Sequence, residues 1–369
     1  MKIPVCIPEF DEEEVKAVTN TMRSGWIARG EELELFEKEL AEFLSVQYVV
    51  TLSSGTAALE VALRALKIEK KEVITTATSC APTANAIIHS GNIPVMTDVS
   101  REDYNIDPEK IEQLITPKTG AILPVHVYGR PAKMDKILAI AEKHDLPVIE
   151  DCAQSFGAKF KGKMTGTFGA IGCFSLNINK IITTGEGGFI ATNHKTAAEN
   201  AKMIRNYGRD PSGTDYCYTH FGHNFKFTNL QASVGRAQLH KAHKLIQARR
   251  ERAQYLKSLL HDVEHIQLPI DDANGFSVGF SFPFVLKQPG MRDKLKRYLE
   301  EKGIEVRTMF RPMCDQPYYK EMFGERKQHY PNAEHLGENG LYIGCYPKLT
   351  KEQMDFMAKS IREKLHAIR

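Results

Sequence analysis

Short apolar runs alternate with helical periodicity from about residue 30 to about residue 200. Most of these runs are rich in Val, Ile, Leu, Ala and Thr, a composition typical of buried strands. The expected strands are residues 48–52, 72–76, 94–97, 121–125, 147–150, 172–175 and 188–192, and the expected helices include residues 56–66, 108–116 and 134–144. This alternation predicts an α/β fold in which a mostly parallel sheet is covered by helices on both faces.

After Thr228 the pattern becomes helical up to about residue 265, and a smaller unit follows. Strands are expected near residues 281–286 and 305–308, and helices near residues 290–302 and 351–365. We interpret the Arg-rich stretch at residues 247–252 as the solvated face of the long helix. The prediction is therefore two domains that share one site, a large domain of residues 1–245 and a small C-terminal α+β domain of residues 246–369.

The composition argues against a nucleic-acid-binding, a membrane-spanning and a metal-binding protein. The chain has 369 residues with 49 Lys and Arg against 46 Asp and Glu, and its charges are interspersed, so no basic surface for nucleic acid is expected. No apolar run approaches the roughly 18–20 residues that span a bilayer, and the first residues lack a signal-peptide pattern. The seven cysteines form no C-x-x-C pair, which indicates reduced thiols, no metal site and a cytoplasmic protein.

Lys180 stands out among the candidate chemical groups because of what surrounds it in the sequence. An acid, Asp151, ends an apolar strand; Ser175 ends a later one; and Lys180 comes just before the glycine-rich turn at residues 183–188. Pyridoxal phosphate enzymes need an amine that forms a Schiff base, an acid that keeps the pyridine nitrogen protonated and a hydroxyl that reaches the phosphate. The alternative is that Lys180 is a surface lysine. Neighbouring isoleucines would lower its pKa, which favours the catalytic interpretation.

Two polar residues follow the strand at residues 147–150. Asp151 could be the N-cap of the next segment or the partner of a pyridinium nitrogen. Gln154, three residues later, could donate to the phenolate oxygen of the cofactor or could be a polar surface residue. Because ligands collect at the carboxyl ends of parallel strands, both residues are expected near the same edge of the sheet.

A phosphate site is expected where a helix follows the first strand. Ser54, Gly55 and Thr56 open that helix, and backbone N–H groups at a helix N-terminus favour a phosphate. Ser-Gly-Thr before a helix is also an ordinary cap. Ser175 could donate to the same phosphate. The turn at residues 184–188 lacks the features of a P-loop or a dinucleotide fingerprint, and we interpret it as a turn that places Lys180.

Taken together, these motifs closely resemble the DegT/StrS family of pyridoxal phosphate-dependent nucleotide-sugar aminotransferases. The resemblance covers nearly the whole chain. It rests on residues 24–27, 54–59, 124–129, 150–154, 174–175, 179–188 and 222–229. It implies the fold type I architecture of aspartate aminotransferase, a large mostly parallel sheet domain with a smaller C-terminal domain.

Residue roles follow from the resemblance. Lys180 would carry the cofactor and shuttle the proton, Asp151 would pair with ring nitrogen N1 and Gln154 would contact O3′. The phosphate would be held by Ser54, Gly55, Thr56 and Ser175, and by Asn224 of a neighbouring subunit, which would make a homodimer with shared active sites obligatory. Trp26, His126 and Arg311 are candidate substrate contacts, although His126 could equally be a core or strand-end histidine.

The resemblance also implies a reaction. The amino group of L-glutamate would pass to the C4 ketone of a 4-keto-6-deoxyhexose linked to a nucleotide diphosphate, for an aminosugar of a surface glycan. Amination at C3 is the main alternative. A sugar dehydratase of the same fold would have histidine in place of Lys180, and a non-catalytic regulator would bind the cofactor without turnover.

Two positions depart from the pattern of relatives. Relatives often place an aromatic residue over the cofactor from the segment that matches residues 78–81, whereas this chain has none there and offers Cys80. Arg311 stands in a segment where relatives have a histidine, and it could instead contact a phosphate or carboxylate of the substrate.

Overall fold

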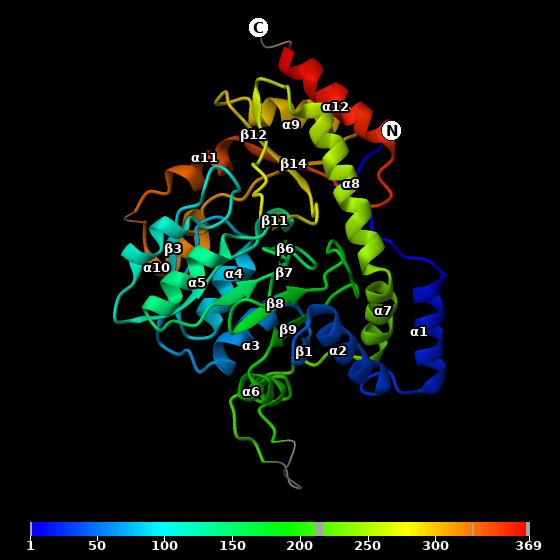
Figure 1. Ribbon diagram of the computed structural model, residues 1–369, viewed down its shortest axis with the longest axis vertical. Helices are drawn as coiled ribbons and strands as arrows, with labels where there is room; N and C mark the ends of the chain where they lie inside the picture. The colour runs from blue at the N-terminus through cyan, green and yellow to red at the C-terminus, as the bar shows by residue number, and fades with distance from the viewer. Residues whose placement is uncertain (1, 211–216, 327, 367–369) are drawn as a thin grey trace.

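The computed structural model describes residues 2–210, 217–326 and 328–366 (Figure 1). A large α/β unit occupies most of the molecule, and a smaller unit lies at one end, where both termini are found (Figure 1). A long helix, α8 (Ala242–Leu260), runs along the side of the molecule and continues from α7 (Asn229–His240) into the smaller unit (Figure 1).

The large unit is built on a mixed sheet. Four of its strands lie in the order β1 (Tyr48–Leu52), β9 (Gly188–Thr192), β8 (Ile171–Ser175) and β5 (Ile149–Asp151), and three more lie in the order β3 (Ile93–Thr97), β2 (Glu72–Thr76) and β4 (Thr119–Leu123). Parallel bridges from β4 and the residues after it to β5 join the two groups, with Asp151 N–H donating to the Pro124 carbonyl at 2.9 Å. Among the described strands of this sheet, β9 alone runs antiparallel to its neighbours, while the other pairs are parallel. The expectation of a mostly parallel sheet is therefore confirmed.

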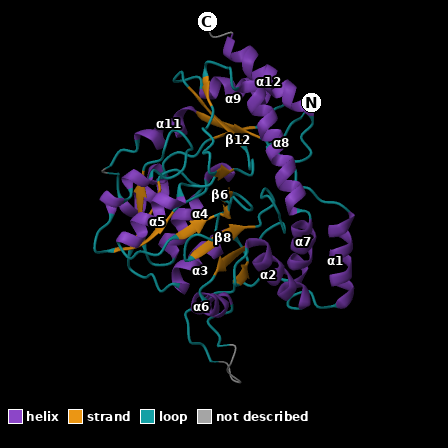
Figure 2. Ribbon diagram, in the orientation of Figure 1, coloured by secondary structure: helices purple, strands orange, loops and turns teal. Residues whose placement is uncertain are grey.

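Alternate side chains of the strands pack on opposite faces of the sheet, as the pleat requires. Val50 and Ile190 face a core formed with α3 (Gly55–Ala65) and α6 (Lys195–Arg205). Val49 and Phe189 face the opposite core, which is formed with α2 (Glu31–Leu44), α7 and α8. Helix α5 (Met134–Lys143) covers β2 and β4, and α3 packs against α4 (Ala81–His89). Helices therefore lie on both faces of the sheet (Figure 2).

The predicted helix at residues 108–116 is wrong. The segment forms two short 3-10 turns instead, Pro108–Lys110 and Glu112–Leu114. The N–H groups of residues 111, 114 and 115 donate to carbonyls three residues earlier, which is the 3-10 pattern and not the α-helical one. Helix α1 (Glu12–Ser24) was not expected, although Asp11 and Glu14 form a capping box at its start.

The smaller unit is an antiparallel sheet in the order β10 (Ile266–Gln267), β12 (Phe282–Leu286), β14 (Gly340–Ile343) and β13 (Val306–Thr308). Its core is closed by α8, α9 (Arg292–Glu301) and α12 (Lys351–His366). Helices α10 (Pro317–Phe323) and α11 (Pro331–Asn339) contribute Tyr319, Ala333 and Leu336 to a core shared with the large unit. A small sheet of β11 (Gly275–Phe276), β6 (Lys159–Phe160) and β7 (Lys163–Met164) also joins the two units.

The predicted boundary between residues 245 and 246 falls inside α8, and the division of residues 1–245 from 246–369 stays a prediction. The ends of those ranges, residues 1 and 367–369, lie outside the described residues. Ile3 belongs to the core of the smaller unit, where its N–H donates to the Gly303 carbonyl at 2.8 Å. The first residues of the chain therefore pack with the C-terminal unit.

The interpretation of residues 247–252 as a solvated face is wrong for Arg249. Its side chain is only 3% exposed. Its Nη1 donates to the carbonyls of Cys345 at 2.6 Å and Phe280 at 3.2 Å, so it ties α8 to two segments of the smaller unit. Within the described ranges, no helix combines the length and apolar character needed to cross a membrane.

Gly172 in β8 offers a test of how tightly the sheet is packed. A Cβ at this position would lie 2.2 Å from the carbonyl oxygen of Gly166, whose own N–H is held by the buried carboxylate of Glu150 at 2.7 Å. Because that backbone cannot give way easily, we expect Gly172→Ala to lower the free energy of unfolding by about 1–3 kcal/mol, measured by urea denaturation. At Gly275 the nearest atom would lie 3.3 Å away, so Gly275→Ala is the control. Equal urea midpoints for the two variants would contradict the explanation.

Candidate active site

Asp151 lies at the end of β5 with its carboxylate in the interior. The residue is 4% exposed. Oδ2 accepts a hydrogen bond from Thr83 Oγ1 at 2.9 Å, and Oδ1 accepts from the N–H of Ala153 at 3.0 Å. Among the described residues, no cationic side chain comes within 4.0 Å of this carboxylate. Burial therefore raises the pKa of Asp151, and the two hydrogen bonds and the more distant charge of Lys180 only partly oppose the rise.

Lys180 is placed by the turn that connects β8 to β9. Its N–H donates to the Asn177 carbonyl at 2.9 Å, and its side chain is half-buried. The Nζ atom lies 5.1 Å from the centroid of the Phe280 ring, which comes from the C-terminal part of the chain. Burial lowers the pKa of Lys180, while Asp151 and Cys80 oppose the change through their charge. A larger fraction of the amine is therefore neutral than in an exposed lysine, as a nucleophile or base requires.

The N-terminus of α3 packs directly onto the end of β8. Ser54 caps the helix by accepting a hydrogen bond from the N–H of Ala57 at 3.1 Å, which leaves the N–H groups of Gly55 and Thr56 without helical partners. A Cβ on Gly55 would lie 2.8 Å from the Cβ of Ser175, so only glycine allows this approach. The result is a cradle of N–H groups beside a serine hydroxyl, which suits a phosphate.

Asn224 lies close to this cradle in the same chain. The carbonyl of the next residue, Phe225, accepts a hydrogen bond from the N–H of Ser53 at 2.9 Å. Asn224 itself is exposed and forms an isolated bridge with Asn206. Its predicted contact with the phosphate of a neighbouring subunit stays a prediction.

Gln154 is buried near Asp151. Its Oε1 accepts a hydrogen bond from the N–H of Tyr128 at 2.7 Å, which fixes the amide and leaves its NH2 group to donate to a ligand. Tyr128 adopts a left-handed backbone conformation with φ of 54°, which is uncommon for a residue with a side chain. The predicted alternative of a polar surface residue does not apply to Gln154.

His126 is a core histidine, so its expected contact with a sugar hydroxyl is not supported. Its Nδ1 accepts a hydrogen bond from the N–H of Ala132 at 2.9 Å, which places the ring hydrogen on Nε2, 3.0 Å from Glu150 Oε2. Glu150 also accepts from backbone N–H groups of residues 166, 168 and 169. Both ring nitrogens and both carboxylate oxygens are therefore used, and this network fixes the strand that carries Asp151.

The two other candidate substrate residues lie outside this hydrogen-bonded centre. Trp26 follows α1, and its side chain is 70% exposed. Arg311 is also exposed and belongs to a segment over the carboxyl end of β2, because the N–H of Met313 donates to the Ala77 carbonyl at 2.8 Å. Their contacts with a substrate stay predictions.

Sequence reasoning missed Thr83 and Phe280. Thr83 lies in the first turn of α4, and nothing in its local sequence indicates the hydrogen bond to Asp151, which is 68 residues away. Phe280 lies a hundred residues after Lys180, so only the folded chain brings them together. Cys80 lies near both groups: burial raises the pKa of its thiol, the charge of Lys180 opposes the rise and that of Asp151 adds to it. Its expected place near the cofactor ring stays a prediction.

These features fit pyridoxal phosphate. Asp151 is a buried carboxylate that lacks a close cation and could pair with a protonated ring nitrogen. Lys180 has the lowered pKa that a cofactor-bearing amine needs. The N–H cradle at Gly55, with Ser175 beside it, could hold the phosphate.

Comparisons with known proteins agree with this assignment. The sequence profile of the DegT/DnrJ/EryC1/StrS aminotransferase family matches residues 8–362. A GDP-perosamine synthase of Escherichia coli O157:H7 is 37% identical over 98% of both chains. A UDP-N-acetyl-3-dehydro-alpha-D-glucosamine 3-aminotransferase of Acidithiobacillus ferrooxidans is 36% identical over 91% of this chain and 89% of its own. The structure of Helicobacter pylori PseC, an aminotransferase involved in the biosynthesis of pseudoaminic acid, superposes with a TM-score of 0.94 at 26% identity over the whole of both chains.

Asp151→Asn should separate stability from cofactor binding. The pKa of Asp151 in the folded protein is raised above the value of about 3.9 for an exposed aspartate. The protonated side chain therefore favours the folded state. This stabilisation is fully present below the unfolded-state pKa and is lost as the pH rises through the folded-state pKa. We expect the variant to melt at a higher temperature than the parent near pH 7 without cofactor, and the difference to shrink in acid. Cofactor binding should weaken by about 3–5 kcal/mol, because the pyridinium loses its buried partner.

Asp103→Asn is the matched control for this test. Burial also raises the pKa of Asp103, so its replacement should follow the same pH trend while cofactor binding stays unchanged. Thermal unfolding across the pH range and titration with pyridoxal phosphate measure the two effects. A lower melting temperature of cofactor-free Asp151→Asn at pH 7 would contradict the electrostatic account.

Proposed function

The chain belongs to the DegT/DnrJ/EryC1/StrS aminotransferase family, and we propose that it moves the amino group of L-glutamate to the C4 ketone of a nucleotide-linked 4-keto-6-deoxyhexose. The protein is a pyridoxal phosphate-dependent sugar aminotransferase. The observation that carries the proposed chemistry is the placement of a half-buried Lys180 of lowered pKa near a buried Asp151 that has no close cation.

The choice of sugar is supported by the relatives. GDP-perosamine synthases of three bacteria are 32–37% identical to the chain, and residues 179–188 resemble the matching stretch of that enzyme. This favours GDP-4-keto-6-deoxymannose as the amino acceptor. The 3-aminotransferase relative supports the second candidate, amination at C3 of a related sugar. Lys180 argues against a dehydratase, in which histidine would replace it.

Each residue of the site has a separate role in the proposed reaction. When bound, pyridoxal phosphate withdraws electrons from the reacting carbon and so makes its C–H bond acidic. Lys180 Nζ, with its lowered pKa, takes the proton from that carbon and returns it. Asp151 holds the ring nitrogen, while Gly55, Thr56 and Ser175 bind the phosphate and fix the position of the ring. The ring of Phe280 covers one side of Lys180 Nζ.

A homodimer with shared sites is part of the proposal. Large apolar side chains are exposed on segments close to the site, among them Ile178 in the turn before Lys180 and Phe221, which is 79% exposed, just before Asn224. Such exposure is typical of surfaces that a partner covers. We place the enzyme in the cytoplasm, where nucleotide sugars and glutamate are available, in a route to surface glycans.

Absorbance spectroscopy tests the reaction. The purified protein with pyridoxal phosphate should show a band near the visible edge that glutamate shifts to the ultraviolet. Lys180→Ala should lose this glutamate-driven cycle, because no amine is left to move the proton, whereas Lys163→Ala, at an exposed lysine outside the site, should keep it. A protein with no cofactor band after incubation would contradict the proposed chemistry.

A substrate panel then tests the sugar. We expect aminated product from GDP-4-keto-6-deoxymannose, detected by mass spectrometry and located at C4 by NMR. UDP- and dTDP-linked 4-keto and 3-keto sugars serve as competitors. Product with the amino group at C3 would replace the proposal with the second candidate.

Mixing two inactive variants tests the shared site. If Asn224 serves the partner's phosphate, a mixed dimer of Lys180→Ala and Asn224→Asp contains one site with both changes and one site with neither. We expect each variant alone to be nearly inactive and the refolded mixture to recover up to about a quarter of the parent activity by random pairing. No recovery, with mixed dimers present by mass spectrometry, would show that Asn224 serves the site of its own subunit.

A further inference from the structure

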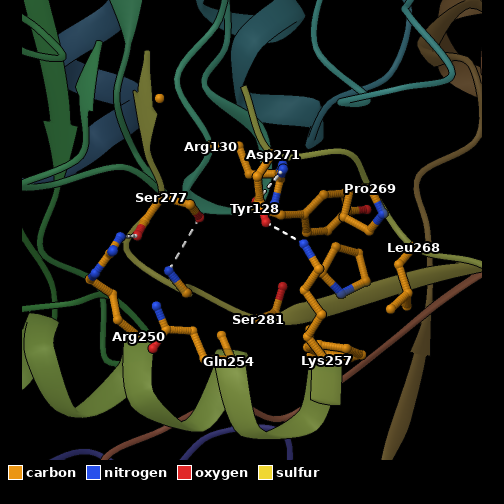
Figure 3. A pocket seen from close by; sticks show the side chains of 15 residues that line it. Tyr128, Arg130, Arg250, Gln254, Lys257, Leu268, Pro269, Asp271, Ser277 and Ser281 are labelled. Carbon is orange, nitrogen blue, oxygen red and sulfur yellow. Dashed lines mark hydrogen bonds and ion pairs between the residues drawn. The ribbon is translucent and has the colours of Figure 1, made fainter. Parts of the chain in front are cut away.

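A cavity of about 240 Å³ lies between α8 and residues 275–283 (Figure 3), and neither Lys180 nor Asp151 lines it. We refer to it as the α8 pocket. The polar residues that matter here are Arg130, Arg250, Gln254, Lys257, Asp271 and Ser281. None of them takes part in the proposed transfer of the amino group.

The walls of the α8 pocket carry excess positive charge. Arg250, Gln254 and Lys257 are spaced at i, i+4 and i+7, so they project from one face of α8 (Figure 3). Arg130 and Lys257 both bind Asp271, at 2.8 and 2.5 Å. Three cations face one carboxylate, which leaves a net charge of +2 on the lining.

Arg250 is held in place without a carboxylate partner. Its guanidinium lies over the Phe276 ring, 3.6 Å from the centroid, and its Nη1 donates to the Ser277 carbonyl at 2.6 Å. Among the described residues, no acid comes within 4.0 Å of it. Stacking and one hydrogen bond therefore fix the planar group and leave its other N–H donors for a ligand.

The hydroxyl of Ser281 is a second, independent indication that the pocket binds a ligand. The residue is 5% exposed, and its buried hydroxyl has no hydrogen-bond partner among the described residues. Ser281 directly precedes β12, and in Figure 3 its hydroxyl points away from α8 into the middle of the pocket. An unsatisfied buried hydroxyl costs about 1–3 kcal/mol, and an acceptor atom bound in the pocket would remove that cost.

We propose that the α8 pocket binds a phosphate or diphosphate group. Arginine, lysine and hydroxyl donors around an excess of positive charge suit phosphate oxygens. The volume lies below the roughly 300–1,000 Å³ typical of sites for drug-sized ligands, so the pocket admits a phosphate-bearing end rather than a whole nucleotide sugar. That end belongs either to the nucleotide-sugar substrate or to a separate phosphorylated metabolite.

The α8 pocket adjoins the active site through one short segment. Gly279 and Ser281 line the pocket, and the ring of Phe280 between them lies over Lys180 Nζ. A ligand that orders this segment would therefore change the surroundings of the catalytic amine.

Calorimetry of the cofactor-loaded protein with pyrophosphate and with inorganic phosphate tests the proposal. We expect pyrophosphate to bind, and Arg250→Gln to weaken binding at least about tenfold through loss of a charged donor. Ser281→Leu should fill the space and abolish binding. Arg252→Gln, on the same helix but outside the lining, should bind like the parent.

Two further readouts keep the test decisive. Gln254→Glu changes an exposed residue at the mouth, so it should fold normally and still weaken binding because it adds a negative charge. The cofactor band and thermal unfolding report the folding of every variant. A parent that does not bind pyrophosphate, or folded Arg250→Gln and Gln254→Glu proteins that bind it as tightly as the parent, would overturn the proposal.

Kinetics distinguish the source of the phosphate. A raised KM for the nucleotide sugar in Arg250→Gln, with kcat unchanged, assigns the α8 pocket to the substrate's diphosphate. An unchanged KM, with pyrophosphate binding lost, assigns it to a separate metabolite. Because binding is measured without any sugar, failure of the proposed sugar transfer would leave this result intact.

Discussion

The arrangement of the site depends on a carboxylate held in the protein interior without a cation beside it. Asp151 keeps this position because the next residue toward the N-terminus, Glu150, accepts hydrogen bonds from three backbone N–H groups and faces His126. Thr83 and Ala153 supply the only hydrogen bonds that the Asp151 carboxylate receives from described residues. The protein thus tolerates an unfavourable electrostatic arrangement that a positively charged ring would relieve, and the fold around β5 is built to maintain it.

The topology of the sheet explains why the separate parts of the site meet. Within the described part of the large sheet, β9 runs antiparallel to both of its neighbours, β1 and β8. The turn before it carries Lys180, and its first residue, Gly188, packs against the backbone of Ser54 at the start of α3. A Cβ on Gly188 would lie 2.5 Å from the Ser54 carbonyl oxygen. The antiparallel direction of β9 and the close packing of Gly188 therefore bring Lys180 and the phosphate cradle to the same edge of the sheet.

Much of the large unit could be predicted from the sequence because its strands are continuous apolar runs buried on both faces. The strands at residues 48–52, 72–76 and 188–192 match the structure residue for residue. Lys180 and Asp151 were identifiable because a strand end and a glycine turn place them. Other features could not be predicted: residues 108–114 form 3-10 turns instead of the expected helix. Arg249 is drawn inward by the carbonyls of Phe280 and Cys345, which are distant in the sequence. His126 was ambiguous because only folding shows that Ala132 and Glu150 occupy its nitrogens.

The unbroken course of α8 has a consequence for how the molecule moves. Its 19 residues span roughly 28 Å at 1.5 Å per residue, and its length packs first on the large unit through Leu245 and Ile246 and then on the small unit through Leu256 and Leu260. Hinges form where element ends or loops absorb changes in backbone angle, and a single helix shared by two units acts as a rigid strut between them. Entry and exit of ligands should therefore rely on rearrangement of surface loops, while the two units keep a fixed mutual orientation.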